Sequence, residues 1–267
     1  MVLTFYKYQG TGNDFIIIDN RDNSLKFNAR EVSGLCDRKL GIGADGLILL
    51  EESGEYDFSM RYFNSDGHEV EMCGNGGRCI IAFAHYHGII NQECTFRAKD
   101  GVHSGGVIDQ TGNNAMVWVS LGDVDKITVE NDHYLVNTGV PHLIKFVEDA
   151  SLVDVMVEGK KIRYSKKFKE SGINVDFCHV ENAGLIVRTY ERGVENETLS
   201  CGTGVTAASI AAVHKGLVSS PVTIQTRGGE LQVDFRKTSN AFYNIRLSGP
   251  VMYVFRGEIH YPKKAKN

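Results

Sequence analysis

Two cysteines, Cys73 and Cys201, each begin the sequence Cys-Gly-x-Gly and lead directly into an apolar segment. The first apolar segment covers residues 78–85, the second covers residues 205–213, and a glycine follows each of them. These patterns predict two buried helices, apolar on nearly all sides, that end at left-handed glycines. Each thiol would then lie at a helix N-terminus, where free backbone N–H groups attract anions and lower the pKa of a thiol.

Two thiols placed in this way are suited to inverting a carbon centre. A thiolate removes a proton from one face of the carbon and a thiol returns a proton to the other face, provided that both pKa values lie near neutrality. A carbon next to a carboxylate is a weak acid, and helix N–H groups that hold the carboxylate would stabilise the developing charge. No cofactor motif is visible, so we expect no cofactor and no metal, and the protein's own groups perform this chemistry.

The two motifs belong to a long internal repeat. In the register that aligns Cys201 with Cys73, 128 residues apart, further identities appear, namely Tyr190 with Tyr62, Glu197 with Glu69, Gly216 with Gly88, Thr223 with Thr95 and Gly229 with Gly101. A spacing of nearly half the chain excludes short-period solenoids. The repeat predicts two similar domains, each of which contributes one thiol to a shared site.

Short apolar or alternating segments between glycine-containing turns predict many strands around the two helices. The predicted fold class is α+β, with mainly antiparallel sheets and one buried helix in each half. A turn at residues 112–114 is the predicted boundary between the halves. The lysine-rich segment 159–172 is expected to be the most loop-like part of the chain.

Composition restricts the partners and the compartment. The 267 residues suffice for two cores, and the net charge of -4 without a long basic run argues against nucleic acid or an anionic membrane as a partner. No apolar run approaches a membrane span, and the N-terminus lacks the pattern of a signal peptide. Six cysteines in this length do not resemble a disulfide framework, so we expect a cytoplasmic protein with reduced thiols.

Plainer interpretations compete at several positions. Asn13 and Asp14 can simply build a turn, and His142 and Glu191 can be ordinary surface groups. Most buried cysteines are inert, which we expect of Cys36, Cys79, Cys94 and Cys178. A metal site using Cys73 and Cys79 is disfavoured because zinc ligands usually lie two to four residues apart. A disulfide between Cys73 and Cys201 would be an oxidation product of the site, and the glycines at 41–46 do not match a nucleotide-binding loop.

Seven segments together resemble the diaminopimelate epimerase family. They are Gly12–Phe15, Tyr62–Gly67, Cys73–Cys79, Pro141–His142, Gly172–Val175, Tyr190–Gly193 and Cys201–Gly204. The resemblance covers nearly the whole chain. It implies a cofactor-independent interconversion of LL- and meso-diaminopimelate, a step of lysine biosynthesis.

The resemblance also assigns roles to residues. It implies that Cys73 and Cys201 are the acid/base pair and that His142 and Glu191 adjust the two thiols. The residues implied to bind the distal amino-carboxylate end are Asn13, Asn64, Asn174, Glu191 and Arg192, and those implied to hold the reacting carboxylate are Gly74, Asn75, Gly202 and Thr203. Two positions depart from the family pattern, because Val140 stands where many members have Asn and Gly46 where many have Gln.

The family fold implies two pseudo-symmetric domains, each a barrel-like sheet wrapped around a central helix, and commonly a homodimer. The expected domains are residues 1–114 with 250–267, and residues 115–249. Two other functions stay open. A proline racemase or hydroxyproline epimerase would share the plan, but such enzymes usually have His at the position of Asn75 and bind a compact ring. A non-catalytic amino-acid-binding protein on the same scaffold is the third possibility.

Overall fold

The computed structural model describes residues 2–239 and 241–261, and the chain forms two compact units. Unit 1 consists of the described residues within 1–117 and 251–267, and unit 2 of those within 118–250. The division falls inside two strands, β8 (Asn114–Ser120) and β17 (Phe242–His260). The sequence-based division placed the boundaries after residues 114 and 249, and positions 262–267 of its last segment lie outside the described residues.

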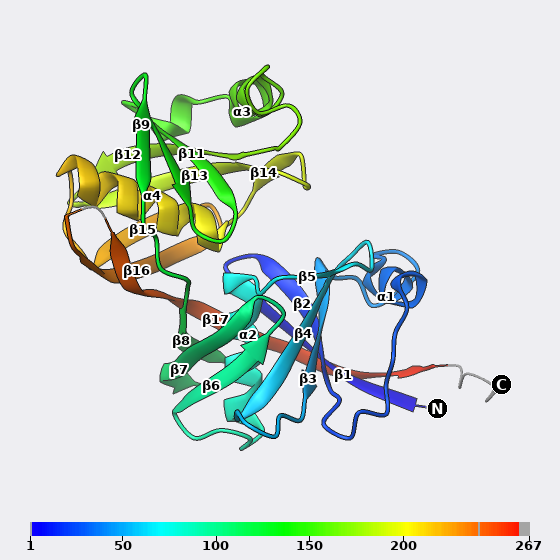
Figure 1. The fold of residues 1–267 in the computed structure, drawn as a ribbon. Helices are drawn as coiled ribbons and strands as arrows, with labels where there is room; N and C mark the ends of the chain where they lie inside the picture. Colours follow the sequence, from blue (N-terminus) through cyan, green and yellow to red (C-terminus); the bar gives the residue numbers. More distant parts are fainter. Residues whose placement is uncertain (1, 240, 262–267) are drawn as a thin grey trace. The chain divides into compact units, whose positions relative to one another are not determined.

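Unit 1 is a sheet wrapped around the helix α2 (Gly74–Tyr86), as Figure 1 shows. Its other elements are β1 (Val2–Gly10), β2 (Asn13–Asp19), α1 (Ala29–Cys36), β3 (Gly46–Glu51), β4 (Phe58–Asn64), β5 (Glu69–Val70), β6 (Glu93–Ala98) and β7 (Gly101–Thr111). Neighbouring strands pair in antiparallel fashion except for the parallel pairs β2–β3 and β4–β6. The second part of β17 pairs antiparallel with β1, from Met252 opposite Gln9 to His260 opposite Val2.

Unit 2 repeats this plan around the helix α4 (Gly202–Lys215). Its elements are β9 (Ile127–Glu130), β10 (His133–Asn137), β11 (Pro141–Phe146), a short 3-10 turn (Ala150–Leu152), α3 (Val155–Arg163), β12 (Asn174–Glu181), β13 (Gly184–Glu191), β14 (Asn196–Thr198), β15 (Val222–Thr226) and β16 (Gly229–Lys237). The parallel pairs here are β11–β12 and β13–β15. The first part of β17 pairs antiparallel with β16.

The internal repeat seen in the sequence extends to every helix and to the strand pairing. A shift of 128 residues, the distance from Cys73 to Cys201, places β2 on β11, β3 on β12, β4 on β13, α2 on α4 and β6 on β15. The two parallel pairs of unit 1 therefore correspond to the two parallel pairs of unit 2. The predicted α+β class, with mainly antiparallel sheet around one central helix per half, is confirmed.

Both central helices are buried over most of their length, as their apolar sequences predicted. Every residue of α2 from Gly74 to Ala84 is buried, and α4 is buried from Gly204 to Ala212. Helix α4 ends at Gly216, whose φ of 79° is left-handed and whose N–H donates to the carbonyl of Val213. The predicted glycine cap at this end is therefore confirmed.

The prediction of a loop over residues 159–172 is wrong in part, because α3 occupies Val155–Arg163. Asp154 caps this helix by accepting a hydrogen bond from the N–H of Val157. Val155 and Gly159 form its buried side, and Gly159 lies against Tyr190 so closely that a Cβ would come within 2.4 Å of the Tyr190 Cβ. The sequence did not reveal this helix, because it is short, its solvent side carries lysines and its buried face consists of only two residues. None of the helices among the described residues is long and apolar enough to cross a membrane.

The first turns of the two central helices differ in how tightly they are packed, which predicts unequal effects of the same substitution. An added Cβ at Gly204 would lie 2.5 Å from Asp176 Oδ1, whereas at the equivalent Gly76 it would meet side-chain atoms of Ile48, Met60 and Phe15 at 3.2, 3.5 and 3.5 Å. We expect Gly204→Ala to lower the free energy of unfolding by about 1–3 kcal/mol more than Gly76→Ala. Urea unfolding of both variants measures the difference, and equal losses would contradict this account.

Candidate active site

In unit 1 the predicted thiol Cys73 occupies the N-cap position of α2, in an extended conformation, and is partly exposed. Its sulfur lies 3.8 Å from the side-chain oxygen of Asn13. The amide of Asn75, in the first turn of α2, donates to the same oxygen at 3.3 Å. Asn13, Cys73, Gly74 and Asn75 therefore form one cluster at the start of the central helix.

A charged network fixes the orientation of Asn13. Its Nδ2 donates to Asp45 Oδ2 at 2.7 Å, which leaves its oxygen directed to Cys73 and Asn75. Arg38 binds Asp45 at 2.7 Å and Asp14 at 2.6 Å. Burial favours a raised pKa for Asp14, but hydrogen bonds and charges from Arg38 and Lys7 outweigh it, and the pKa lies well below its usual value. Asp14 is thus a permanent anion between two cations.

In unit 2 the second predicted thiol, Cys201, occupies the N-cap position of α4 and is buried. A chain of polar groups leads from it into the core. The Thr203 hydroxyl lies 3.5 Å from the Cys201 sulfur and 3.0 Å from Nε2 of His142. The other ring nitrogen of His142 lies 2.7 Å from Asp176 Oδ2, and Asp176 Oδ1 accepts a hydrogen bond from the Thr189 hydroxyl at 2.7 Å. His142 and Asp176 are both fully buried.

The expectation of a lowered thiol pKa is wrong for Cys201. Burial raises its pKa well above the usual value, and the negative charges of Glu191 and Asp176 raise it further. Hydrogen bonds from Thr203 and from the backbone of Gly204 lower it, but by less. Desolvation of a thiolate therefore outweighs the helix N-terminus here, and Cys201 is a neutral thiol at neutral pH.

The remaining predicted residues of unit 2 lie near the same chain. Asn174 Nδ2 lies 3.3 Å from Nε2 of His142, and its oxygen accepts a hydrogen bond from the backbone N–H of Arg192 at 2.8 Å. The Arg192 guanidinium donates to the carbonyl of Ser171. Glu191 ends β13, and in unit 1 Asn64 ends the corresponding strand β4.

Four polar residues around the thiols were not predicted, namely Asp45, Arg78, Asp176 and Thr189. Asp176 had the clearest signal, because it lies between the apolar residues Val175 and Phe177 in the buried part of the strand Asn174–Glu181. A buried carboxylate requires a partner. Only the fold shows that this partner is a histidine from another strand.

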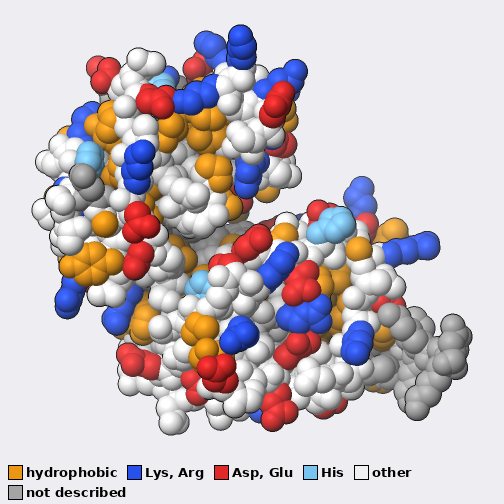
Figure 2. All heavy atoms as spheres, viewed as in Figure 1, with side chains coloured by type: hydrophobic (Ala, Val, Ile, Leu, Met, Phe, Trp, Pro, Cys, Tyr) orange, Lys and Arg blue, Asp and Glu red, His pale blue; other side chains and the backbone are white. Residues whose placement is uncertain are grey.

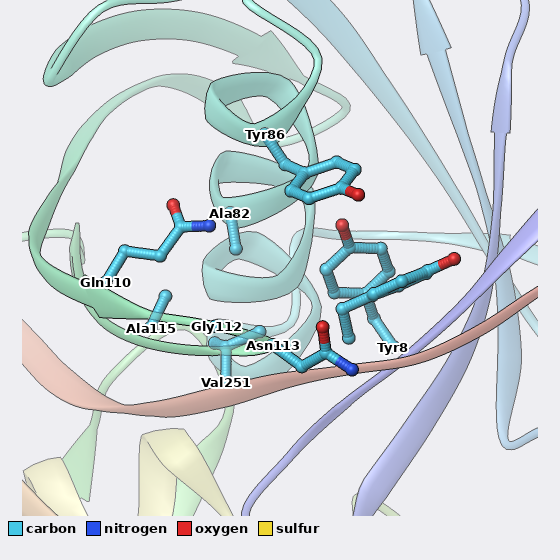
Figure 3. A pocket seen from close by; sticks show the side chains of 9 residues that line it. Tyr8, Ala82, Tyr86, Gln110, Gly112, Asn113, Ala115 and Val251 are labelled. Atoms are coloured by element: carbon cyan, nitrogen blue, oxygen red, sulfur yellow. The ribbon is translucent and has the colours of Figure 1, made fainter.

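Two hollows on unit 1 lie away from these residues. One is lined by Tyr8, Ala82, Tyr86, Gln110, Gly112, Asn113, Ala115, Val251 and Tyr253, and its volume of about 10 Å³ admits about one water molecule (Figure 3). Another, of about 300 Å³, lies over the N-terminal end of β1 and includes Asp19 and Arg256. Neither includes a predicted site residue.

The surface shows no concentration of one charge on the face drawn in Figure 2, where Lys and Arg alternate with Asp and Glu. No group of three or more His, Cys, Asp or Glu residues in the described part of the chain is arranged to hold a metal ion.

Known proteins resemble the chain over nearly its whole length. The family model for diaminopimelate epimerase matches residues 5–127 and 134–253. A diaminopimelate epimerase of Flavobacterium psychrophilum is 46% identical over 96% of this chain and 100% of that protein. One from Aquifex aeolicus is 41% identical over 96% of this chain and 98% of that protein.

Solved structures of lower identity share the fold. A PhzF-family phenazine biosynthesis protein of Bacillus anthracis aligns over 98% of this chain and 100% of its own with a TM-score of 0.72 at 16% identity. A hydroxyproline epimerase of Agrobacterium vitis aligns over 97% of this chain and 92% of its own with a TM-score of 0.69 at 13% identity. At these identities the likeness concerns the fold alone.

The Thr203 hydroxyl lies between His142 and Cys201, and its removal should change the pKa of Cys201 in a predictable direction. Because the hydrogen bond from Thr203 lowers the pKa of Cys201, Thr203→Val raises that pKa further, and the rate of Cys201 alkylation then rises only at a higher pH. Thr203→Ser keeps the hydroxyl and serves as the matched control. Peptide mass spectrometry after timed iodoacetamide treatment gives the pH midpoint for each protein. A Val variant with an unchanged midpoint would show that the hydroxyl does not act on the thiol.

Proposed function

Because the chain belongs to the diaminopimelate epimerase family, we propose that it interconverts LL- and meso-2,6-diaminopimelate with two cysteines as acid and base. The observation that supports this most strongly is the equivalence of Cys73 and Cys201. Each is the N-cap residue of a central helix in one of two units with the same order of elements.

We propose a reaction in which one thiolate removes the proton from the α-carbon and becomes a thiol. The bonding electrons pass into the carboxylate, which carries the added charge as an enolate. The second cysteine then gives its proton to the opposite face of the carbon and becomes a thiolate. One proton is taken and one returned, so the configuration changes and neither oxidant nor cofactor is needed.

The reacting carboxylate would be held by the first turns of the two helices. Neither N-cap cysteine offers its helix a side-chain oxygen, and Gly74, Asn75, Gly202 and Thr203 supply the following N–H groups. Such donors are most effective where water is excluded and where charge grows during the reaction. In this proposal they are the groups that make the weak carbon acid reactive.

The distal end of a long substrate would be recognised by polar groups from both units. Asn13 and Asn64 lie in unit 1, and Asn174, Glu191 and Arg192 lie in unit 2. A planar guanidinium at Arg192 suits a carboxylate through two parallel hydrogen bonds. A proline-sized ring offers no second amino-carboxylate end, so this set favours diaminopimelate over the proline racemase alternative.

Two polar side chains that many family members have are absent here, because Gly46 stands in place of Gln and Val140 in place of Asn. At Gly46 a Cβ would lie 2.6 Å from both the Tyr62 ring and the Phe63 carbonyl oxygen, so Tyr62 fills the space that a larger side chain would need. Val140 offers no polar group in place of the family's Asn. We infer that backbone groups or the amide of Asn137, which accepts a hydrogen bond from the N–H of Gly139, take over at that end.

We also infer that the enzyme acts in lysine biosynthesis as a cytoplasmic homodimer. All six cysteines are free, which suits a reducing compartment. Apolar side chains are exposed along β17 at Met252, Val254 and Phe255, as expected of a surface that meets another subunit.

Light scattering should give twice the chain mass of 29.5 kDa. A mass of one chain at micromolar concentration would exclude the dimer.

The two-thiol proposal predicts the loss of turnover when either cysteine is changed. In deuterated water the enzyme should place deuterium at the α-carbon of diaminopimelate but not of proline. Cys73→Ser and Cys201→Ser should each lower kcat/KM at least about 100-fold, because a hydroxyl is a far poorer base than a thiolate. Cys94→Ala, within β6, is the control that removes a thiol outside the site.

Nuclear magnetic resonance of the substrate measures both the deuterium uptake and the change of configuration. Normal turnover in either serine variant would disprove the acid/base pair. Exchange with proline and none with diaminopimelate would favour the racemase alternative instead.

A further inference from the structure

The guanidinium of Arg78 is fully buried in the first turns of α2, directly after the Cys73 motif. Its nitrogens donate to the Gly74 carbonyl at 3.3 Å, to Asn75 Oδ1 at 3.0 Å and to the Thr11 hydroxyl at 3.4 Å, while Nε has no hydrogen-bond partner. All of these partners are neutral. Within the described residues no carboxylate forms an ion pair with Arg78, and the groups that interact with its charge are the thiols of Cys79 and Cys73.

Arg78 nevertheless remains a cation. Burial lowers its pKa to about 10, which still leaves it protonated at neutral pH. An uncompensated buried charge is costly, and the usual remedy is a counter-ion nearby. Arg78 therefore favours a negative charge on one of its acidic neighbours.

The acidic groups around the start of α2 differ in their ability to take that charge. Burial raises the pKa of Cys79 far above its usual value even beside Arg78, and the buried phenol of Tyr8 behaves likewise. Cys73 is the neighbour that is partly exposed, so a negative charge on its sulfur would be hydrated and would also interact with the charge of Arg78.

The carboxylates in this region are already paired. Asp14 binds Lys7 and Arg38, and Asp45 binds Arg38, so these four charges balance one another. On the other side, Asp100 accepts the N–H of Met72 and lies 3.3 Å from His103.

Unit 2 has the opposite electrostatics at the equivalent place. The position that corresponds to Arg78 is Thr206, whose neutral hydroxyl donates to the Gly202 carbonyl at 2.9 Å, just as Arg78 donates to that of Gly74. The charges that act on Cys201 are those of Glu191 and Asp176, which are both negative. One thiol thus has a buried cation beside it and the other has anions.

We propose that Arg78 is the positioning residue that makes Cys73 the ionised thiol of the free enzyme and leaves Cys201 as the protonated one. This inference deepens the proposed two-thiol reaction and depends on it for its catalytic meaning. The resting enzyme then takes a proton through Cys73 and returns one through Cys201. It is ready for the diaminopimelate isomer whose α-proton faces Cys73, and it must exchange a proton before the next turnover of that isomer.

The pH dependence of alkylation tests the proposal without any turnover. In the unmodified protein the rate of Cys73 labelling by iodoacetamide should reach its midpoint at a lower pH than that of Cys201. The midpoint is compared because it does not depend on how easily the reagent reaches each thiol. Arg78→Met should move the Cys73 midpoint upward and slow its labelling at pH 7 about tenfold, since a neighbouring cation favours a thiolate by that order.

Two further variants separate charge from structure. Arg78→Lys keeps a cation and should retain most of the Cys73 reactivity, whereas Thr206→Val, the matched change in unit 2, should leave the Cys73 midpoint unchanged. Circular dichroism and thermal unfolding establish that each variant is folded. If Arg78→Met does not fold, the unmodified protein and Arg78→Lys still decide the question.

A lower midpoint for Cys201 than for Cys73, or a folded Arg78→Met with an unchanged Cys73 midpoint, would overturn the proposal. The expected labelling pattern together with a lack of epimerisation of diaminopimelate would instead reject the proposed function and leave this assignment of charge intact.

Discussion

The two central helices begin at cysteines, which offer no side-chain oxygen as a cap, although the first turn of each helix is largely buried. The other two α-helices are capped by oxygen-bearing side chains, α1 by Asn28 in a reciprocal pair with Glu31 and α3 by Asp154. The N–H groups of a buried helix start need hydrogen-bond partners. An anionic ligand group is the natural partner. The rest of each unit, including its wrapped sheet, keeps this first turn buried and in place.

The repeat gave both units the same framework, but the proposed inversion of a carbon by one thiolate and one thiol requires the two thiols to differ. The differences lie at equivalent positions in the two units. Arg78 corresponds to Thr206, and Ile48 on β3 corresponds to Asp176 on β12. Because of these differences the charge of a buried arginine acts on Cys73, whereas a buried histidine and carboxylate are connected to Cys201. The strands and helices are conserved between units, and the chemistry differs in side chains alone.

Sequence reasoning succeeded where local pattern determines structure. The Cys-Gly-x-Gly turns and the apolar runs after them were sufficient for the two helices, and the glycine at position 216 was sufficient for the end of α4. It failed where the answer depends on distant partners. The pKa of Cys201 follows from burial and from Glu191 and Asp176, which lie on other strands. Likewise, nothing local to Asp45 shows that it holds the amide of Asn13.

The buried pair of His142 and Asp176 is better understood as a means of positioning than as a source of stability. Burying such a pair removes both groups from water, and apolar residues of equal size often give equal or greater stability. Its contacts nevertheless fix both groups, because Thr189 donates to Asp176 while Thr203 and Asn174 contact the ring. At the equivalent place unit 1 has Ile48, which packs well without any such network. The fold therefore does not need the pair. Its position is explained by Cys201, because the Thr203 hydroxyl contacts both His142 and the Cys201 sulfur.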